Sequence, residues 1–244
     1  MEKGLLLTSA HCTCSDTKIV YIGCNYRESS DCIPGQTTQE YEIANFVPHP
    51  LYDRDIDRSY DVAIIQLNTS ITRFHEPNGP LLWNIKEITL DSNEALNDEP
   101  LTIVGYGRIE GVDPNNKPYY LQYGNISCVS REICSAELPE GHSEITASMM
   151  CGRGQNEENG YGIVTCSGDS GGPWLSDAEI GVQIGITSWG YNGCSESNCQ
   201  CCVGYPRMAA NIADTVVFEW IETVQQNYDF KFLNIANLQI IKSI

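Results

Sequence analysis

The sequence predicts an all-β protein, either a sandwich or a barrel, and two features of the chain support this class. Short runs rich in β-branched and aromatic residues recur along the 244 residues, and Gly, Pro, Asn and Asp separate them. Short strands between turn residues in this way are typical of sandwiches and barrels. A chain of this length also buries a sizeable core. The clearest strand-like runs are residues 18–22, 62–67 and 101–106.

A single helix is expected near the C-terminus, where residues 217–226 place apolar side chains at helical spacing. The chain contains no internal repeat, heptad run or low-complexity tract. No apolar stretch approaches the ~20 residues that a membrane-spanning helix requires. We therefore expect no membrane partner.

Charge and cysteine content narrow the class further. The formal net charge is −18, whereas a surface that binds nucleic acid needs clustered Lys and Arg. Nucleic acid is therefore excluded as an expected partner. Twelve cysteines in a chain of this size indicate an oxidising compartment, and hence a secreted protein with disulfide bonds.

Residues 165–173, Thr-Cys-Ser-Gly-Asp-Ser-Gly-Gly-Pro, form the most informative stretch of the chain. Glycine adopts positive φ and allows close backbone approach, so this loop can turn the N–H groups of Gly168 and Ser170 toward one point. Such a pair forms an oxyanion hole, which stabilises the charge that develops in acyl transfer. The loop therefore predicts Ser170 as a nucleophile, and a serine nucleophile needs a base and an orienting acid.

Both partners of the serine are found upstream. His11 lies in Leu-Thr-Ser-Ala-His-Cys, and Asp61 opens an apolar strand in Ser-Tyr-Asp-Val-Ala-Ile-Ile-Gln-Leu. The three motifs, in the order His, Asp, Ser, resemble those of the chymotrypsin/trypsin-like serine proteases, peptidase family S1. The resemblance implies that Ser170 is the nucleophile, that His11 transfers its proton, and that Asp61 orients His11.

The resemblance also implies a fold. It covers residues 1–227 and implies a single protease domain of two antiparallel Greek-key β-barrels followed by a C-terminal helix. Residues 228–244 form an extension of unknown role. Only ten residues precede His11, where the family carries an activation segment and further strands. We therefore expect the first barrel to be incomplete.

The same comparison gives Asp169 a role. In the family, the acid before the serine pairs with an N-terminal ammonium that zymogen cleavage creates, and this ion pair holds the oxyanion hole open. Met1 is not expected to substitute, because residues 4–9 form the strand that leads into His11. We therefore expect Asp169 to be an unpaired acid near the interior, which is costly. The chain as written is expected to have little or no peptidase activity.

The resemblance implies a primary specificity pocket without charge. Val164 stands at its base, and alignment through Tyr205 places Val203 in its wall. A basic side chain would be buried there without a counter-ion, so small or medium apolar P1 residues are predicted. If the cysteine-rich insertion shifts the alignment, Val203 is simply a core residue. The implied substrate-binding residues are Val164, Thr165, Ser188, Trp189, Gly190 and Val203, with Gly190 at the pocket entrance.

Two disulfide bonds follow from the resemblance, Cys134 with Cys151 and Cys166 with Cys194. The Cys-Gln-Cys-Cys cluster at residues 199–202 fits no tetrahedral zinc pattern well, and disulfides are favoured in a secreted protein. We therefore expect no metal and no cofactor.

Two functions remain open at the level of sequence. The first is a secreted, monomeric serine endopeptidase that acts through an acyl-enzyme, with protein or peptide substrates and with protein protease inhibitors as further partners. Asn68 and Asn125 are its glycosylation acceptors. The alternative is a non-catalytic homologue that binds a partner, or an inactive truncated product. Reaction with a serine-directed fluorophosphonate separates these functions.

Overall fold

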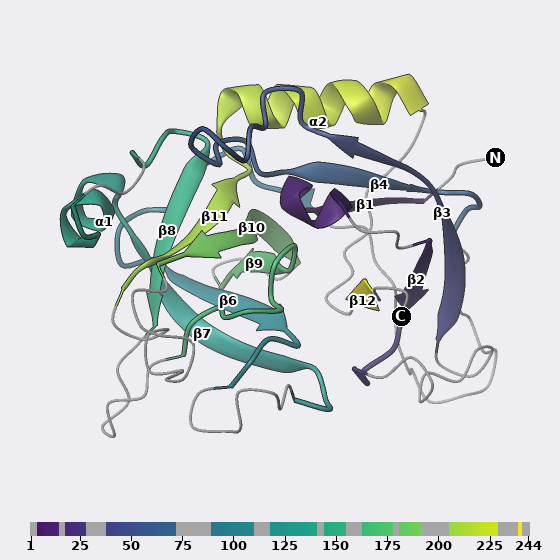
Figure 1. Ribbon diagram of the computed structural model, residues 1–244, viewed down its shortest axis with the longest axis horizontal. Helices are drawn as coiled ribbons and strands as arrows, with labels where there is room; N and C mark the ends of the chain where they lie inside the picture. Colours follow the sequence, from purple (N-terminus) through teal and green to yellow (C-terminus); the bar gives the residue numbers. More distant parts are fainter. Residues whose placement is uncertain are drawn as a thin grey trace.

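The described residues form two β-sheets, and one long helix lies along one side of both (Figure 1). No helix in the described part of the chain is both long and apolar enough to cross a membrane. The computed structural model describes residues 4–14, 18–27, 38–71, 89–109, 118–140, 144–154, 163–177, 181–191, 205–228 and 239–240.

The first sheet contains five antiparallel strands, β1 (Leu5–Thr8), β2 (Ile19–Ile22), β3 (Gln39–Pro48), β4 (Ala63–Leu67) and β12 (Gln239–Ile240). Their order is β1, β4, β3, β2, β12, and over the described residues the sheet does not close on itself. The first barrel is thus incomplete, as predicted. The strand β12 lies within the predicted C-terminal extension and pairs with the outer edge of β2, so part of this extension joins the sheet.

The second sheet closes into a barrel. Its six barrel strands are β6 (Pro100–Gly105), β7 (Gln122–Val129), β8 (Met149–Gly154), β9 (Pro173–Ser176), β10 (Val182–Gly190) and β11 (Arg207–Asn211). Pairing of β10 with β11 closes the ring, and the short β5 (Thr89–Leu90) adds to β10 in parallel. Trp174 fills the interior, fully buried, and donates its Nε1–H to Thr187 Oγ1 at 3.0 Å. The second barrel is therefore complete, as predicted.

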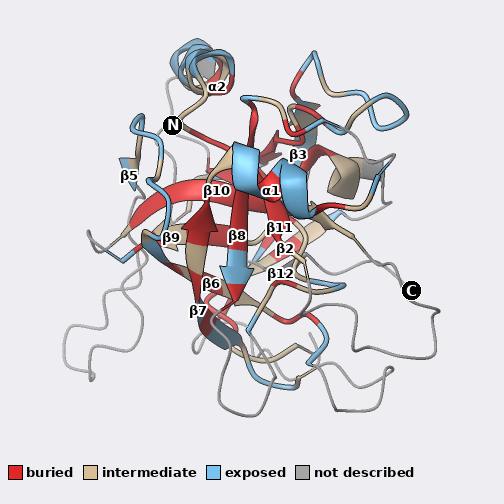
Figure 2. Cartoon of the chain, turned by 90° about the vertical axis from the view of Figure 1, so that its left-hand side faces the viewer, coloured by how far each residue is buried: buried red, intermediate tan, exposed pale blue. Residues whose placement is uncertain are grey.

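One apolar cluster joins the two sheets to the helix α2 (Thr215–Tyr228). The carboxylate of Asp214 accepts the N–H groups of Val216 and Val217 and so caps the start of this helix. Figure 2 shows the exposed face of α2 turned outward from the sheets. The buried members of the cluster are Leu5, Leu7, Val62, Ile64, Ile186, Ala210, Ile212, Val217, Ile221 and Val224. The predicted C-terminal helix is confirmed and forms part of the core shared by both sheets.

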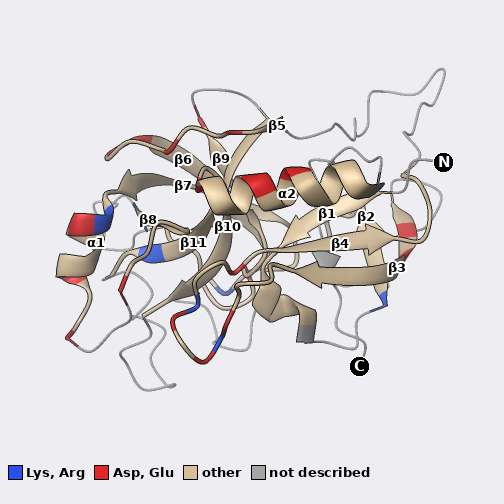
Figure 3. Cartoon of the chain, turned by 90° about the horizontal axis from the view of Figure 1, so that it is seen from above, with Lys and Arg blue, Asp and Glu red and all other residues tan. Residues whose placement is uncertain are grey.

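A short helix, α1 (Arg131–Glu137), carries a cysteine into a second apolar cluster. Cys134 is fully buried and forms the predicted disulfide bond with Cys151 of β8. Cys24 is disulfide-bonded as well. The predicted bond between Cys166 and Cys194 involves a residue outside the described part of the chain. Acidic residues occur on α1 and α2 and in surface loops (Figure 3).

Candidate active site

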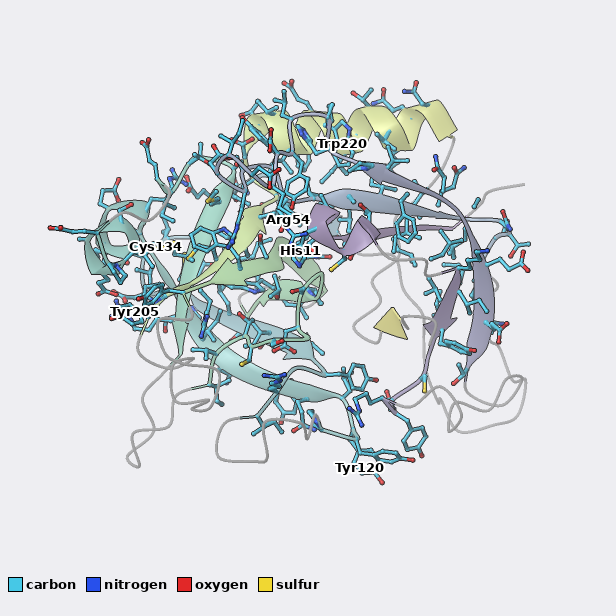
Figure 4. All side chains as sticks on the ribbon, in the orientation of Figure 1. His11, Arg54, Tyr120, Cys134, Tyr205 and Trp220 are labelled. Atoms are coloured by element: carbon cyan, nitrogen blue, oxygen red, sulfur yellow. A yellow bond between two sulfur atoms is a disulfide. The ribbon has the colours of Figure 1, made fainter. Side chains whose placement is uncertain are left out.

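His11 and Asp61 lie against one another at the same end of two neighbouring strands of the first sheet, because Thr8 of β1 pairs with Ala63 of β4. His11 stands in a 3₁₀ helix, η1 (Ala10–Cys14), directly after β1, and Asp61 stands just before β4. His11 lies between the two sheets in Figure 4. Its Nδ1 is 2.7 Å from Asp61 Oδ2, and its backbone N–H donates to Asp61 Oδ1 at 2.8 Å. These two bonds fix both the imidazole and the backbone that carries it.

Asp61 is 3% exposed and its carboxylate has a third donor, since the hydroxyl of Ser188 donates to Oδ2. Ser188 belongs to β10 of the second barrel, so the carboxylate links the two sheets. Hydrogen bonds from several donors stabilise a buried carboxylate. Asp61 is thus suited to orient His11 and to stabilise a positive charge on its ring.

The backbone before Asp61 is strained, and aromatic contacts hold it in place. Tyr60 has φ of 56°, a left-handed conformation that is a genuine outlier for a bulky residue. Its ring stacks on His49 with centroids 4.9 Å apart, and His49 in turn meets the edge of Trp220 in α2. The N–H of Tyr60 donates to Ser148 Oγ at 3.1 Å. These contacts fix the turn that presents Asp61.

The surroundings of His11 and His49 shift their pKa values in opposite directions. Burial lowers the pKa of His11, but hydrogen bonds to Asp61 and Cys12, together with the negative charge of Asp61, outweigh burial and raise this pKa above 6.5. At His49 burial dominates and lowers the pKa. His11 is therefore the histidine whose protonated form the protein stabilises, as a proton-transferring base requires.

The loop that carries Ser170 packs against the segment that leads to His11. Gly168 and Gly171 have φ of 105° and 81°, the positive values that the sequence predicts for glycines in this loop. A Cβ added at Gly171 would collide with Thr8 Oγ1 and would lie 3.4 Å from the backbone nitrogen of Ser9. The serine loop thus lies directly on the chain two to three residues before His11.

Two backbone donors of this loop remain available. The N–H groups of Gly168 and Ser170 donate to no backbone or side-chain acceptor within the described ranges, whereas those of Asp169, Gly171 and Gly172 all do. Donors without a protein acceptor, at the two positions that the sequence predicted, are suited to receive a developing oxyanion.

The carboxylate of Asp169 was expected to be unpaired, and the structure corrects this expectation in part. Its Oδ1 accepts the N–H of Gly107 at 2.7 Å, and its Oδ2 accepts the N–H of Cys166 at 2.8 Å. Charge-assisted bonds of this kind stabilise a carboxylate. Asp169 therefore ties the serine loop to the chain that follows β6.

The predicted substrate-binding residues fall into two groups. Ser188, Trp189 and Gly190 form the end of β10, and Arg58 lies over the Trp189 ring, 5.3 Å from its centroid. Val164 is half-buried and Thr165 is buried, both leading into the serine loop. Val203 and Cys194 lie outside the described residues.

One residue that lies beside Gly190 was not predicted from the sequence. A Cβ added at Gly190 would collide with Nη1 of Arg207, which is the first residue of β11 and 4% exposed. The sequence alignment through Tyr205 did not place Arg207 beside Gly190, because only the pairing of β10 with β11 reveals this contact.

A closed barrel beside an open β-sheet, with a half-buried His11 and a buried Asp61 between them, defines a double-barrel class of β-protein. The family model described as Trypsin matches residues 1–216, and the chain belongs to this family. Trypsin delta of Drosophila melanogaster is 30% identical over 215 residues, which are 87% of this chain and 72% of that protein. Trypsin of Simulium vittatum is 28% identical over 200 residues, covering 79% and 69% of the two chains.

A solved structure agrees with these relatives. Neuropsin, described as a serine protease expressed in the limbic system of mouse brain, superposes with a TM-score of 0.66 at 26% identity. The match covers 90% of this chain and 83% of the neuropsin chain. The trypsin-like fold and the chymotrypsin/trypsin family, both predicted from the motifs, are thereby confirmed.

Proposed function

We propose that this member of the trypsin family is a serine endopeptidase that acts through Ser170, His11 and Asp61. The observation that carries the proposal is the hydrogen-bonded His11–Asp61 pair together with the contact of the serine loop with residues 8 and 9. A nucleophile, a base and an orienting acid on adjoining segments are the parts that acyl transfer needs.

In the proposed first half-reaction, Ser170 Oγ attacks the carbonyl carbon of the scissile peptide bond while His11 takes the hydroxyl proton. The oxyanion of the tetrahedral intermediate is held by the N–H groups of Gly168 and Ser170. The C–N bond then breaks, and His11 gives its proton to the leaving amine. An acyl ester on Ser170 remains.

In the second half-reaction, water attacks the ester carbonyl and gives a proton to His11. The bond from carbon to Ser170 Oγ breaks, and His11 returns the proton to that oxygen. Throughout both halves, Asp61 keeps Nδ1 of His11 as a donor and stabilises the imidazolium, which agrees with the short Nδ1–Oδ2 distance of 2.7 Å.

Reaction with a fluorophosphonate tests this proposal, because an activated serine oxygen attacks the phosphorus of the reagent, displaces fluoride and keeps the phosphonyl group. The protein is expected to gain one label on Ser170 by mass spectrometry, and Ser170→Ala is expected to gain none. Ser167→Ala is the matched control, since this exposed serine lies in the same loop and is expected to label like the unmutated protein. A folded protein that takes no label would favour the non-catalytic binding function. The labelling rate also tests the prediction of low activity.

Further parts of the proposal concern the setting. The disulfide bond between Cys134 and Cys151 supports secretion into an oxidising compartment. Asn68 and Asn125 are both exposed, as glycosylation acceptors must be. We propose proteins or peptides as substrates, protein protease inhibitors as further partners and a monomeric state. The preference for small or medium apolar P1 residues stays a prediction, and Arg207 offers a competing one.

A further inference from the structure

An arginine side chain lies at the end of the strand expected to bind substrate. Arg207, at the start of β11, stands directly opposite Gly190 at the end of β10. Its side chain is 4% exposed, and its guanidinium occupies the space in front of Gly190. Gly190 was expected to leave the pocket entrance open, and the open space contains a cation.

The direction of the Arg207 side chain follows from its strand. Side chains alternate along β11, and Met208 packs outside the barrel near Cys134 whereas Ala209 packs inside with Trp174. Arg207 shares the face of Ala209. Its partner on β8 is Gly152, where an added Cβ would lie 2.7 Å from the Trp174 ring. Arg207 therefore lies on the interior face at the rim of the barrel.

The guanidinium is fixed at this rim. Its Nη1 donates to the carbonyl oxygen of Tyr191 at 3.3 Å. A guanidinium presents five N–H donors in a planar fork that matches a carboxylate with two parallel hydrogen bonds. In a site shielded from water, such a charged pair is stronger than at an exposed surface.

We propose that Arg207 binds the carboxylate of an Asp or Glu at the P1 position of the substrate, so that the enzyme cleaves after acidic residues. This inference rests on the proposed function of Ser170 as the nucleophile. A carboxylate at P1 adds a charged acceptor for the guanidinium, which an apolar P1 side chain does not offer. A basic P1 side chain would face a like charge.

A second arginine supports an acidic substrate. Arg58 is exposed and lies over the ring of Trp189, next to Gly190. Cations thus stand beside two successive residues at the end of β10, in a chain whose formal net charge is −18. A cation at either position attracts an acidic side chain of the substrate.

The test measures binding apart from catalysis. In Ser170→Ala, intact fluorescent peptides that differ only at P1 are titrated, with Asp, Glu, Val, Leu and Arg at that position. The Asp and Glu peptides are expected to bind roughly 10- to 100-fold more tightly than the Val peptide, the range for charged hydrogen bonds. Fluorophosphonate labelling of the unmutated protein is measured separately, so failure of Ser170 as nucleophile and failure of the P1 inference are distinguishable.

Two substitutions in the Ser170→Ala background assign the effect. Arg207→Gln is expected to remove the preference for Asp and Glu, and Arg207→Lys to keep part of it. Arg153→Gln is the matched control, because Arg153 is on the neighbouring β8, 44% exposed and paired with Glu137 on the outer side. It changes the net charge equally and is expected to leave the preference unchanged.

Several results would overturn the inference. Tighter binding of the Val or Leu peptide would favour the prediction of an apolar P1 residue. Tighter binding of the Arg peptide would contradict both the apolar and the acidic P1 predictions. Equal loss of preference in Arg207→Gln and Arg153→Gln would assign it to net charge alone. If Arg207→Gln does not fold, the P1 preference of the protein with Arg207 intact and that of Arg207→Lys decide whether the inference holds. If Arg207→Gln folds and keeps the full preference for Asp and Glu, the role of Arg207 is contradicted.

Discussion

At the scale of single residues, the two described histidines show how different surroundings give the same side chain two different roles. Both His11 and His49 lose water on folding, which disfavours the charged imidazolium. Only His11 has a carboxylate on its Nδ1, at 2.7 Å, whereas His49 stacks between aromatic rings. The carboxylate reverses the sign of the pKa shift. His11 is thus prepared for proton transfer, and His49 serves as a neutral packing element.

This contrast predicts two separate titrations. By NMR, the imidazole resonances of His11 are expected to titrate above pH 6.5 and those of His49 below it. Because Ser170 needs neutral His11, fluorophosphonate labelling is expected to rise with pH through a midpoint above 6.5. The charged form of His11 stabilises the fold fully below pH 6.5, and this contribution is lost as pH rises through the pKa of His11 in the folded protein.

Asp61→Asn is the control for the histidine titrations. It removes the charge that raises the pKa of His11 while burial remains, so the His11 titration is expected to move to lower pH. The His49 titration is expected to stay in place, because Asp61 is not among the groups that shift it. A His11 titration that Asp61→Asn leaves unmoved would contradict the assigned cause.

At the scale of elements, the serine loop depends on glycine at the position where it meets β1. Gly171→Ala forces an L-residue to φ of 81° and also drives its Cβ into Thr8. The first effect costs about 1–2 kcal/mol and the second about 1–3 kcal/mol of unfolding free energy. In Gly171→Ala the rate at which the fluorophosphonate labels Ser170 is also expected to fall, because the loop shifts away from residues 8 and 9.

Gly181→Ala separates these two costs. Gly181 has φ of 84° and nothing within 4 Å of an added Cβ, so only the backbone cost applies. Chemical denaturation of both variants measures the difference, which is expected to be about 1–3 kcal/mol. Equal destabilisation, with labelling kept in both variants, would mean that the loop does not rely on contact with Thr8.

Local patterns predicted the elements well and long-range contacts poorly. The apolar runs at 18–22, 62–67 and 101–106 form β2, β4 and β6 within one residue, since period and composition are local properties. The pairing of β12 with β2 and the placement of Arg207 opposite Gly190 depend on register between distant segments. No local pattern determines such register, so both were missed, and with them the cation at the predicted pocket.

At the scale of the whole molecule, the shared core makes the two sheets depend on one helix. Leu5 and Leu7 of β1 meet Ile186 of β10 and Val217 of α2 in one cluster. His11 and Asp61 belong to the first sheet, while Ser170 and Ser188 belong to the second barrel and its loops. The site therefore exists only while the sheets stay together, and α2 contributes to their association from outside the site.

Two adjacent valines of α2 test this dependence. Val217 is fully buried in the shared cluster, whereas Val216 is 43% exposed. Valine-to-alanine changes at the two positions alter helix propensity equally, so a difference between them reports burial. Val217→Ala is expected to lower the free energy of unfolding by about 2–3 kcal/mol, and Val216→Ala to change it by less than about 0.5 kcal/mol. Hydrogen exchange is expected to lose protection together at Ile64 in the first sheet and Ile186 in the second barrel, because both residues belong to the shared cluster. Lost protection in one sheet alone would show that the sheets unfold independently and that α2 does not couple them.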